Sequence, residues 1–323
     1  MRHVFRRLVL SLTAAVAACA IAAPVAAAGN KAYVAYGDSY SSGPGFSDSD
    51  NSWTCMQSSQ NYPSIVAAHY GLGAKNSGNW GDYSCAGAKF ADLATQVNNS
   101  HTGSPTPLGP DTKVVTFTIG GNEPIGPSGK SVYDAITTCA DPAVDCTAPS
   151  VAATLPTAAD ITALDRYGRN AFDRGLSSAV LNIENWTWTG SGHAKVEIIS
   201  YPQLVGSGGC TDTLNSPGKW GYLPAEAVYI HNLEFAVKNA QAATAAYFSS
   251  LGGDVVAVDA LTPTTAAAGV TDKGMCASSG AWINQPAWYA GAYFPSNFAN
   301  RSNHPTATGM TGLANLAIAA SGM

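Results

Sequence analysis

The stretch KAYVAYGDSYSSGPG, residues 31–45, places a serine directly after an apolar, β-prone run. Ser39 lies in a loop that is too small and too polar to pack as core, between Gly37 and Gly43, which permit tight turns. A serine hydroxyl at the end of a buried strand can attack a carbonyl carbon. It is a weak nucleophile at neutral pH, so this chemistry requires a base nearby.

The base is sought among five histidines after residue 28: His69, His101, His193, His231 and His304. The first four lie in helical patterns, in a Ser/Thr/Pro loop or in a turn before a strand, and we expect them to be structural or solvated. His304 differs, because it lies in the polar loop of residues 300–305 just before the terminal helix. Pro305 can open that helix and so fix the end of the loop.

Two other predicted strands end in polar loops. Gly120-Gly121-Asn122-Glu123 follows the second clear strand, and Tyr201-Pro202-Gln203 follows the third. The carboxyl ends of parallel strands lie at one edge of a sheet, where ligands bind. We therefore expect Asn122 to face Ser39 across that edge.

The elements that must position these residues alternate along the chain. Short apolar, β-branched runs at 33–36, 113–119, 195–201 and 254–258 predict strands, with a weaker one at 73–76. Helical spacing predicts helices at 164–185, 224–248 and 308–320. This alternation predicts an α/β fold with a mainly parallel sheet covered on both faces. Residues 43–60, 139–158 and 206–222 are predicted to be loop insertions.

Four blocks in this order resemble those of the SGNH (GDSL-type) hydrolases: GDSYSSG, Gly87 within SCAGAKF, GGN and NHPT. The resemblance covers nearly the whole mature chain and is closest to the secreted actinobacterial esterases and lipases, which also carry three disulfides. It implies a three-layer α/β/α sandwich of flavodoxin-like type with disulfide-braced loops. It also implies a secreted serine esterase or lipase that uses no cofactor.

The resemblance implies a role for each matched residue. Ser39 would attack the ester carbonyl, and His304 would take its proton and pass it to the leaving alcohol. The oxyanion would be held by the backbone N–H groups of Ser39 and Gly87 and by the side-chain amide of Asn122. A side chain at position 87 would block the approach of the oxyanion. The alternative for Gly87 is a plain turn glycine, and the alternative for Asn122 is a helix cap or turn residue.

Two positions depart from the family pattern. Glu123 stands where the third block usually has aspartate, so the bracing of Asn122 changes. Arg301 stands where the family places the acid that orients the histidine, and a guanidinium cannot accept the imidazole N–H. Either Ser39 and His304 act as a dyad, or a backbone carbonyl replaces the carboxylate. We expect the backbone carbonyl of Arg301 to take this role, with Asp272 or Asp259 as alternative acids.

The first 28 residues have the features of a secretory signal peptide: Arg2, Arg6 and Arg7, an apolar run from Leu8 to Ala23, and Ala26-Ala27-Ala28. We expect one domain over residues 29–323. A lipoprotein cleavage site at Cys19 is the alternative. The mature chain would have 13 Lys+Arg against 21 Asp+Glu, a net charge of −8, which gives no electrostatic footprint for nucleic acid. We expect a monomer without a stable membrane span.

Six cysteines remain after residue 28, an even number typical of disulfides in an exported protein. Fifteen pairings are possible; the simplest is the sequential order Cys55–Cys85, Cys139–Cys146 and Cys210–Cys276. There is no CxxC pair and no complete calcium loop, so we expect no metal.

The sequence leaves the substrate open. An aromatic-rich segment with Trp282, Trp288, Tyr289, Tyr293, Phe294 and Phe298 precedes His304. It could form an apolar wall for the acyl group or only a local core, and Trp53 and Trp80 could line the opposite side. A small-molecule or lipid ester fits this description, and so would a short-chain or plant-polymer ester. The alternatives are a carbohydrate O-acetylesterase or a phospholipase on the same scaffold, or a surface or binding protein with a decayed site.

Overall fold

The computed structural model describes residues 30–49, 55–76, 78–102, 106–141, 143–206, 208–211, 221–265, 272–277, 279–285 and 302–323. The proposed signal peptide and Cys19 lie outside these residues.

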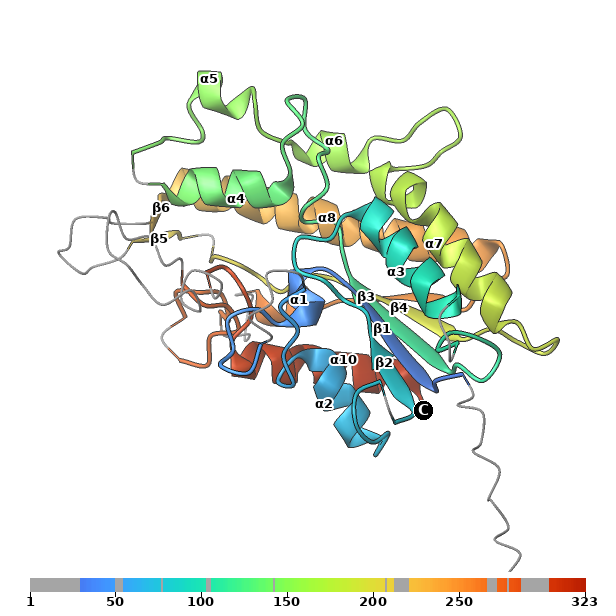
Figure 1. The fold of residues 1–323 in the computed structure, drawn as a ribbon. Helices are drawn as coiled ribbons and strands as arrows, with labels where there is room; N and C mark the ends of the chain where they lie inside the picture. Colours follow the sequence, from blue (N-terminus) through green and yellow to red (C-terminus); the bar gives the residue numbers. More distant parts are fainter. Residues whose placement is uncertain are drawn as a thin grey trace, which may run out of the picture.

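A parallel sheet forms the centre of the molecule (Figure 1). Its strands are β1 (Tyr33–Gly37), β2 (Trp80–Asp82), β3 (Val114–Thr118), β4 (Lys195–Ile199) and β7 (Val255–Val258). They lie in the order β2-β1-β3-β4-β7, and every pair is parallel. The chain therefore reverses its direction of winding between β1 and β3, which is where ligands bind in such sheets.

Helices cover both faces of the sheet. The described helices are α1 (Ser39–Ser42), α2 (Tyr62–His69), α3 (Phe90–Thr102), α4 (Val132–Ala140), α5 (Pro149–Ala152), α6 (Ala158–Thr162), α7 (Ala171–Thr187), α8 (Pro224–Ser250) and α10 (Ala307–Ser321), with a 3₁₀ turn at Thr262–Thr264. In Figure 1, α3, α7 and α8 lie above the sheet, and α2 and α10 lie below it. The predicted three-layer α/β/α fold is confirmed.

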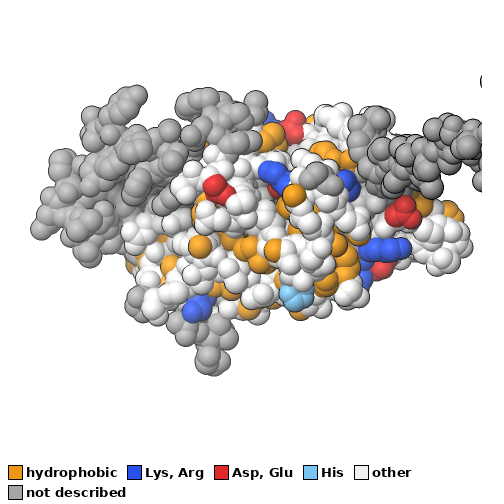
Figure 2. All heavy atoms as spheres, turned by 60° about the horizontal axis from the view of Figure 1, so that its bottom comes forward, with side chains coloured by type: hydrophobic (Ala, Val, Ile, Leu, Met, Phe, Trp, Pro, Cys, Tyr) orange, Lys and Arg blue, Asp and Glu red, His pale blue; other side chains and the backbone are white. Residues whose placement is uncertain are grey.

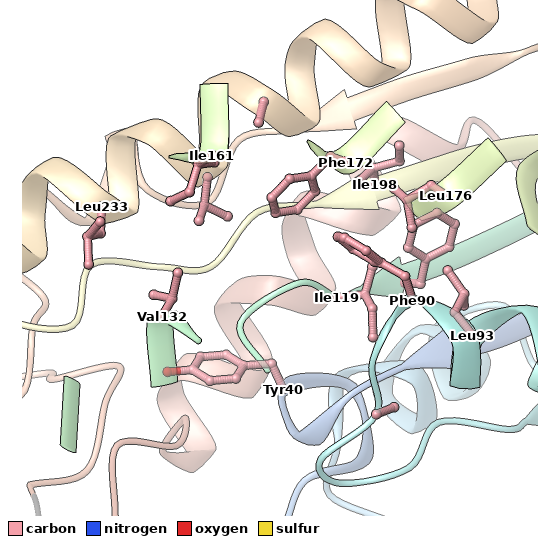
Figure 3. Packing of buried hydrophobic residues seen from close by; sticks show 14 of the residues in the cluster. Tyr40, Phe90, Leu93, Ile119, Val132, Ile161, Phe172, Leu176, Ile198 and Leu233 are labelled. Carbon is pink, nitrogen blue, oxygen red and sulfur yellow. The ribbon is translucent and has the colours of Figure 1, made fainter. Parts of the chain in front are cut away.

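The alternation of side chains along the buried strands supplies a core to each face. Val34, Phe117 and Ile198 point to one side and pack with α3, α7 and α8. Figure 3 shows this core, with Phe90, Phe172 and Leu176 side by side. The other side chains, such as Tyr33 and Ile199, pack on α2 and α10. On the face shown in Figure 2, hydrophobic and uncharged polar side chains predominate and charged side chains are few.

The predicted strand at 73–76 is wrong. Gly71, Gly73 and Asn76 have φ of 63°, 83° and 62°, and left-handed residues at this spacing cannot continue a strand. The strand begins instead at Trp80. The helix predicted from residue 164 begins at Ala171, because Asn170 forms a capping box with Asp173.

Disulfides fix two of the predicted loop insertions. Cys55 is bonded to Cys85 and Cys139 to Cys146. Cys276 is also disulfide-bonded, whereas the side chain of Cys210 lies outside the described part. The insertion at 206–222 carries a small antiparallel pair, β5 (Cys210–Thr211) with β6 (Gly221–Tyr222). No helix among the described residues is long and apolar enough to cross a membrane.

Candidate active site

Ser39 lies at the first turn of the short helix α1, directly after β1, and is half-buried. Asp38 caps this helix, because its carboxylate accepts the N–H of Tyr40 at 2.9 Å. Gly37 has φ of 119°, and a Cβ there would lie 2.4 Å from the carbonyl oxygen of Thr118. Only glycine therefore lets β1 turn so sharply into the helix that presents Ser39.

Gly87 lies in the exposed loop before α3. Its φ of 80° is left-handed, which favours glycine, and a Cβ there would meet no atom within 4 Å. The backbone at Gly87 thus borders open space.

Asn122 follows β3, and its side-chain amide donates a hydrogen bond to the carbonyl of Ala88 at 3.3 Å. Glu123 also reaches the loop before α3: its carboxylate accepts the N–H of Phe90, the first residue of α3, at 2.9 Å. The longer side chain of glutamate therefore does not leave the Asn122 loop unbraced. It ties this loop to the N-terminus of α3, where a negative charge is favourable.

His304 is held in a backbone ladder with the segment 281–284. Asn284 donates both its N–H and its side-chain amide to the carbonyl of His304, at 2.9 and 3.0 Å. Asn303, buried and left-handed with φ of 60°, bonds its N–H to the carbonyl of Asn284. Thr306 caps α10 through the N–H of Gly309. The position of the imidazole is therefore fixed by two elements, the ladder and the helix.

Tyr40 joins the serine and histidine loops. Its hydroxyl donates to the carbonyl of Asn303 at 2.6 Å, and its ring centroid lies 5.7 Å from that of His304. Residues 263 positions apart are thus in direct contact.

Four of the predicted site residues line one cavity of about 200 Å³. They are Ser39, Gly87, Asn122 and His304, and the cavity is completed by Pro44, Met56, Ala86 and Tyr133. The four predicted residues come from four separate segments of the chain. A hydroxyl, an imidazole, a glycine backbone and a carboxamide around one cavity can perform acyl transfer.

Behind Ser39, a buried carboxyl connects two loops. The hydroxyl of Tyr201 donates to Asp38 at 2.5 Å and accepts the N–H of Gly121 at 2.8 Å. Burial raises the pKa of Asp38 to about 7, against the hydrogen bonds from Tyr201 and the Tyr40 N–H, which lower it. Asp38 therefore braces the loop that carries Ser39.

The other histidines have contacts elsewhere. His101 stacks on Trp186 with ring centroids 4.0 Å apart. His193 lies beside Glu184, and His231 lies beside Glu234. His69 is exposed at the end of α2.

The alternative acids are also bonded elsewhere. Asp259 accepts from Lys238 at 3.0 Å, and Asp272 accepts the N–H of Gly274 at 2.7 Å. Neither lines the cavity that holds His304. Arg301 lies outside the described residues.

The predicted aromatic wall is only partly within the described part. Trp282 packs its ring on Gly312 of α10, as in the local-core alternative. Trp80 stacks on Tyr33, with ring centroids 6.2 Å apart, in the core below the sheet, so its proposed place at the pocket is wrong. Trp53 and the five aromatic residues from Trp288 to Phe298 lie outside the described residues.

A second cavity of about 50 Å³ lies beside Ser39 and His304. Its apolar lining comes from Val132 and Ile136 of α4, Leu204 after β4 and Val237 of α8. Nothing in the sequence distinguishes these residues, because an apolar residue that lines a pocket has the same pattern as one that fills a core. For Tyr201, the signal in the sequence is its position at the end of a predicted strand.

In the described part of the chain, no group of three or more His, Cys, Asp or Glu side chains is arranged to hold a metal ion. The side chains around the larger cavity include a hydroxyl, a carboxamide and an imidazole.

No family model matches the sequence. Lipase 2 of Streptomyces coelicolor is 29% identical over 196 residues, which are 58% of this chain and 58% of the relative. A lipase of Streptomyces rimosus is 37% identical over 134 residues, 40% of this chain and 43% of the relative. The chain thus spans about half the length of the curated relatives it matches.

Solved structures match over more of the chain. The extracellular lipase of S. rimosus has a TM-score of 0.58 at 22% identity, covering 91% of this chain and 100% of that one. Phospholipase A1 of Streptomyces albidoflavus has a TM-score of 0.59 at 24% identity, covering 89% and 97%. The chain shares the fold of these proteins. Together with the two curated lipases, they confirm the resemblance to SGNH (GDSL-type) hydrolases of the actinobacterial type.

Proposed function

We propose that this chain is a secreted serine esterase or lipase that hydrolyses carboxylic esters through an acyl-enzyme. The observation that carries the proposal is the meeting of Ser39, Gly87, Asn122 and His304 at one cavity. The similarity to proteins named lipase and phospholipase A1 supports the same class of reaction.

In the proposed mechanism, the Oγ of Ser39 attacks the ester carbonyl while His304 takes its proton. The tetrahedral oxyanion accepts hydrogen bonds from the N–H groups of Ser39 and Gly87 and from the Asn122 amide. Collapse expels the alcohol, which receives the proton from His304. Water, deprotonated by His304, then attacks the acyl-enzyme and releases the acid.

The imidazolium formed in each step needs an acceptor for its second N–H. We assign this role to the backbone carbonyl of Arg301, which would fix the tautomer and the ring direction. A carbonyl stabilises the imidazolium less than a carboxylate does, since it carries only a partial charge.

Export is part of the proposal. The N-terminal 28 residues have the pattern of a signal peptide, and the disulfides suit an oxidising compartment. We expect a monomer that acts on a small-molecule or lipid ester and does not bind nucleic acid.

A fluorophosphonate probe tests the proposal directly, because it phosphonylates only an activated serine. We expect the mature protein to be labelled at Ser39 and to hydrolyse p-nitrophenyl esters. The Ser39→Ala variant should lose both properties, whereas Ser177→Ala, on α7 and outside the two cavities, should keep both. An unlabelled, inactive wild-type protein would instead favour a decayed surface or binding protein.

The phospholipase and O-acetylesterase alternatives differ in substrate. Phosphatidylcholine vesicles and acetylated xylan, offered beside p-nitrophenyl esters, separate them by the rate of acid release.

A further inference from the structure

The smaller cavity beside Ser39 is continuous with the larger one. Ser39, Asn122, Tyr133 and His304 line both, so they form the junction between them. The residues that line only the smaller cavity include Val132, Ile136, Leu204, Glu234 and Val237. The smaller cavity therefore extends from the nucleophile into the protein, between α4 and α8.

This cavity is small and mostly apolar at its walls. The side chains of Val132, Ile136, Leu204 and Val237 are between 2% and 9% exposed. Figure 3 shows the Tyr40 ring extending toward Val132 at the start of α4. The volume is about 50 Å³. At roughly 10–15 Å³ for each water-sized atom, it has room for about three to five heavy atoms.

The helix walls are fixed in place. α4 begins with a capping box, and the Cys139–Cys146 disulfide holds its last turn. The hydroxyl of Tyr222 bonds to the carbonyl of Ile136 at 3.1 Å.

The wall formed by Leu204 is bonded to α8. Glu234 accepts the N–H of Leu204 at 2.7 Å and lies 3.3 Å from the Nδ1 of His231. A longer chain would have to displace this hydrogen-bonded carboxyl, which is itself buried. Lengthening the pocket would therefore break packing and hydrogen bonds together.

We propose that this cavity binds the acyl group and restricts the substrates to esters of short acids, of two to four carbons. The inference rests on the proposed function, because it requires Ser39 to be the nucleophile. Ile136, Leu204 and Val237 set the limit of the acyl chain. The larger, open cavity then takes the alcohol, whose size is not restricted in the same way.

The chain-length profile of the wild-type enzyme is the first test. Initial rates are measured on p-nitrophenyl esters from acetate to decanoate, each below its micellar concentration. We expect kcat/KM to be highest between acetate and butanoate and to fall at least tenfold by octanoate, since one methylene that does not fit changes the rate about tenfold or more. A flat profile, or a maximum at octanoate or decanoate, would overturn the inference.

Substitutions of Val237 move the limit in both directions. Val237→Ala should raise the ratio of kcat/KM for hexanoate to kcat/KM for butanoate about tenfold. Val237→Leu should lower the ratio of kcat/KM for butanoate to kcat/KM for acetate. Val228→Ala is the matched control, because Val228 lies on the same helix and is 47% exposed. Its profile should equal that of the wild type. Folded Val237 variants with an unchanged profile would contradict the assignment of the pocket.

The two proposals fail in different ways. A protein that is labelled by the fluorophosphonate and prefers long esters overturns only the short-acyl limit. A protein that is neither labelled nor active on any ester overturns the proposed function and, with it, the inference.

Discussion

The two cavities beside Ser39 are built differently. The walls of the larger one are loops at the carboxyl ends of β1 and β3, joined by hydrogen bonds through Tyr201 and Glu123. The smaller one shares Ser39 and His304 with it and adds apolar side chains of α4, α8 and Leu204, which are fixed by packing. The Cys139–Cys146 disulfide holds the last turn of α4. Hydrogen bonds fix the direction of donors and acceptors, which the reaction needs. Packing fixes volume, which selects the acyl group.

This difference predicts two kinds of variants. Changes in the loop region should reduce kcat for every ester, because all esters share one transition state. Changes in the helix pocket should alter the order of preference among esters. The predictions below concern the loop region and decrease in expected size.

His304→Ala should have the largest effect, because it removes the proposed base. We expect kcat/KM to fall by about 10⁴-fold or more on all esters, with an unchanged melting temperature. His69→Ala, at an exposed position of α2, is the matched control and should retain full activity. If both variants keep comparable rates, His304 is not the base.

Asn122→Ala should reduce kcat by about 10²–10³-fold, the loss measured when one oxyanion donor is removed. Asn122→Asp should be at least as harmful, because it places a carboxylate where a donor is required. Asn182→Ala, on the exposed part of α7, serves as the control. A loss that appears only in KM would assign Asn122 to ground-state binding instead.

The comparison of the two cavities also explains which parts of the molecule can be predicted from the sequence. Residues that lie next to the reaction occupy short motifs, since a turn such as Gly37-Asp38-Ser39 requires particular residues at fixed spacing. The strands at β1, β3, β4 and β7 were also predicted, because continuous apolar runs mark buried parallel strands.

The parts that could not be predicted depend on tertiary packing. The start of α7 was predicted too early because 164–170 has apolar residues at helical spacing, and the capping box at Asn170 decides the boundary. Val132, Ile136 and Val237 line a pocket only because α4 and α8 are placed over Ser39. That placement depends on contacts between segments about a hundred residues apart.

Tyr201→Phe should have an intermediate effect. It keeps the ring, which meets Tyr40 edge to face at 4.8 Å, but removes the bonds to Asp38 and Gly121. The ring of Tyr201 lines the smaller cavity and is kept in the variant, whereas the hydrogen bonds that position the two loops are lost. We therefore expect kcat to fall about tenfold with little change in KM.

The pH profile distinguishes this positioning role from a loss of stability. The Tyr201 hydrogen bond favours ionised Asp38 and lowers its pKa, which burial nevertheless raises to about 7. Without it the pKa of Asp38 should rise, and the acidic limb of kcat should move to higher pH. The variant keeps the other titratable side chains that line this pocket, which are Tyr40, Tyr133, Glu234 and His304. Tyr229→Phe, which removes the bond to the carbonyl of Pro156, should leave the limb in place.

Arg301→Ala should have the smallest effect, although it stands where the family places an acid. If the backbone carbonyl at position 301 orients the imidazole of His304, removal of the guanidinium leaves that carbonyl in the chain. We expect kcat/KM within about threefold of the wild type, as for the exposed control Arg166→Ala. A folded Arg301→Ala protein with almost no activity would show that the side chain itself is required. The orientation of His304 would then depend on a charged group, and the backbone account would be wrong.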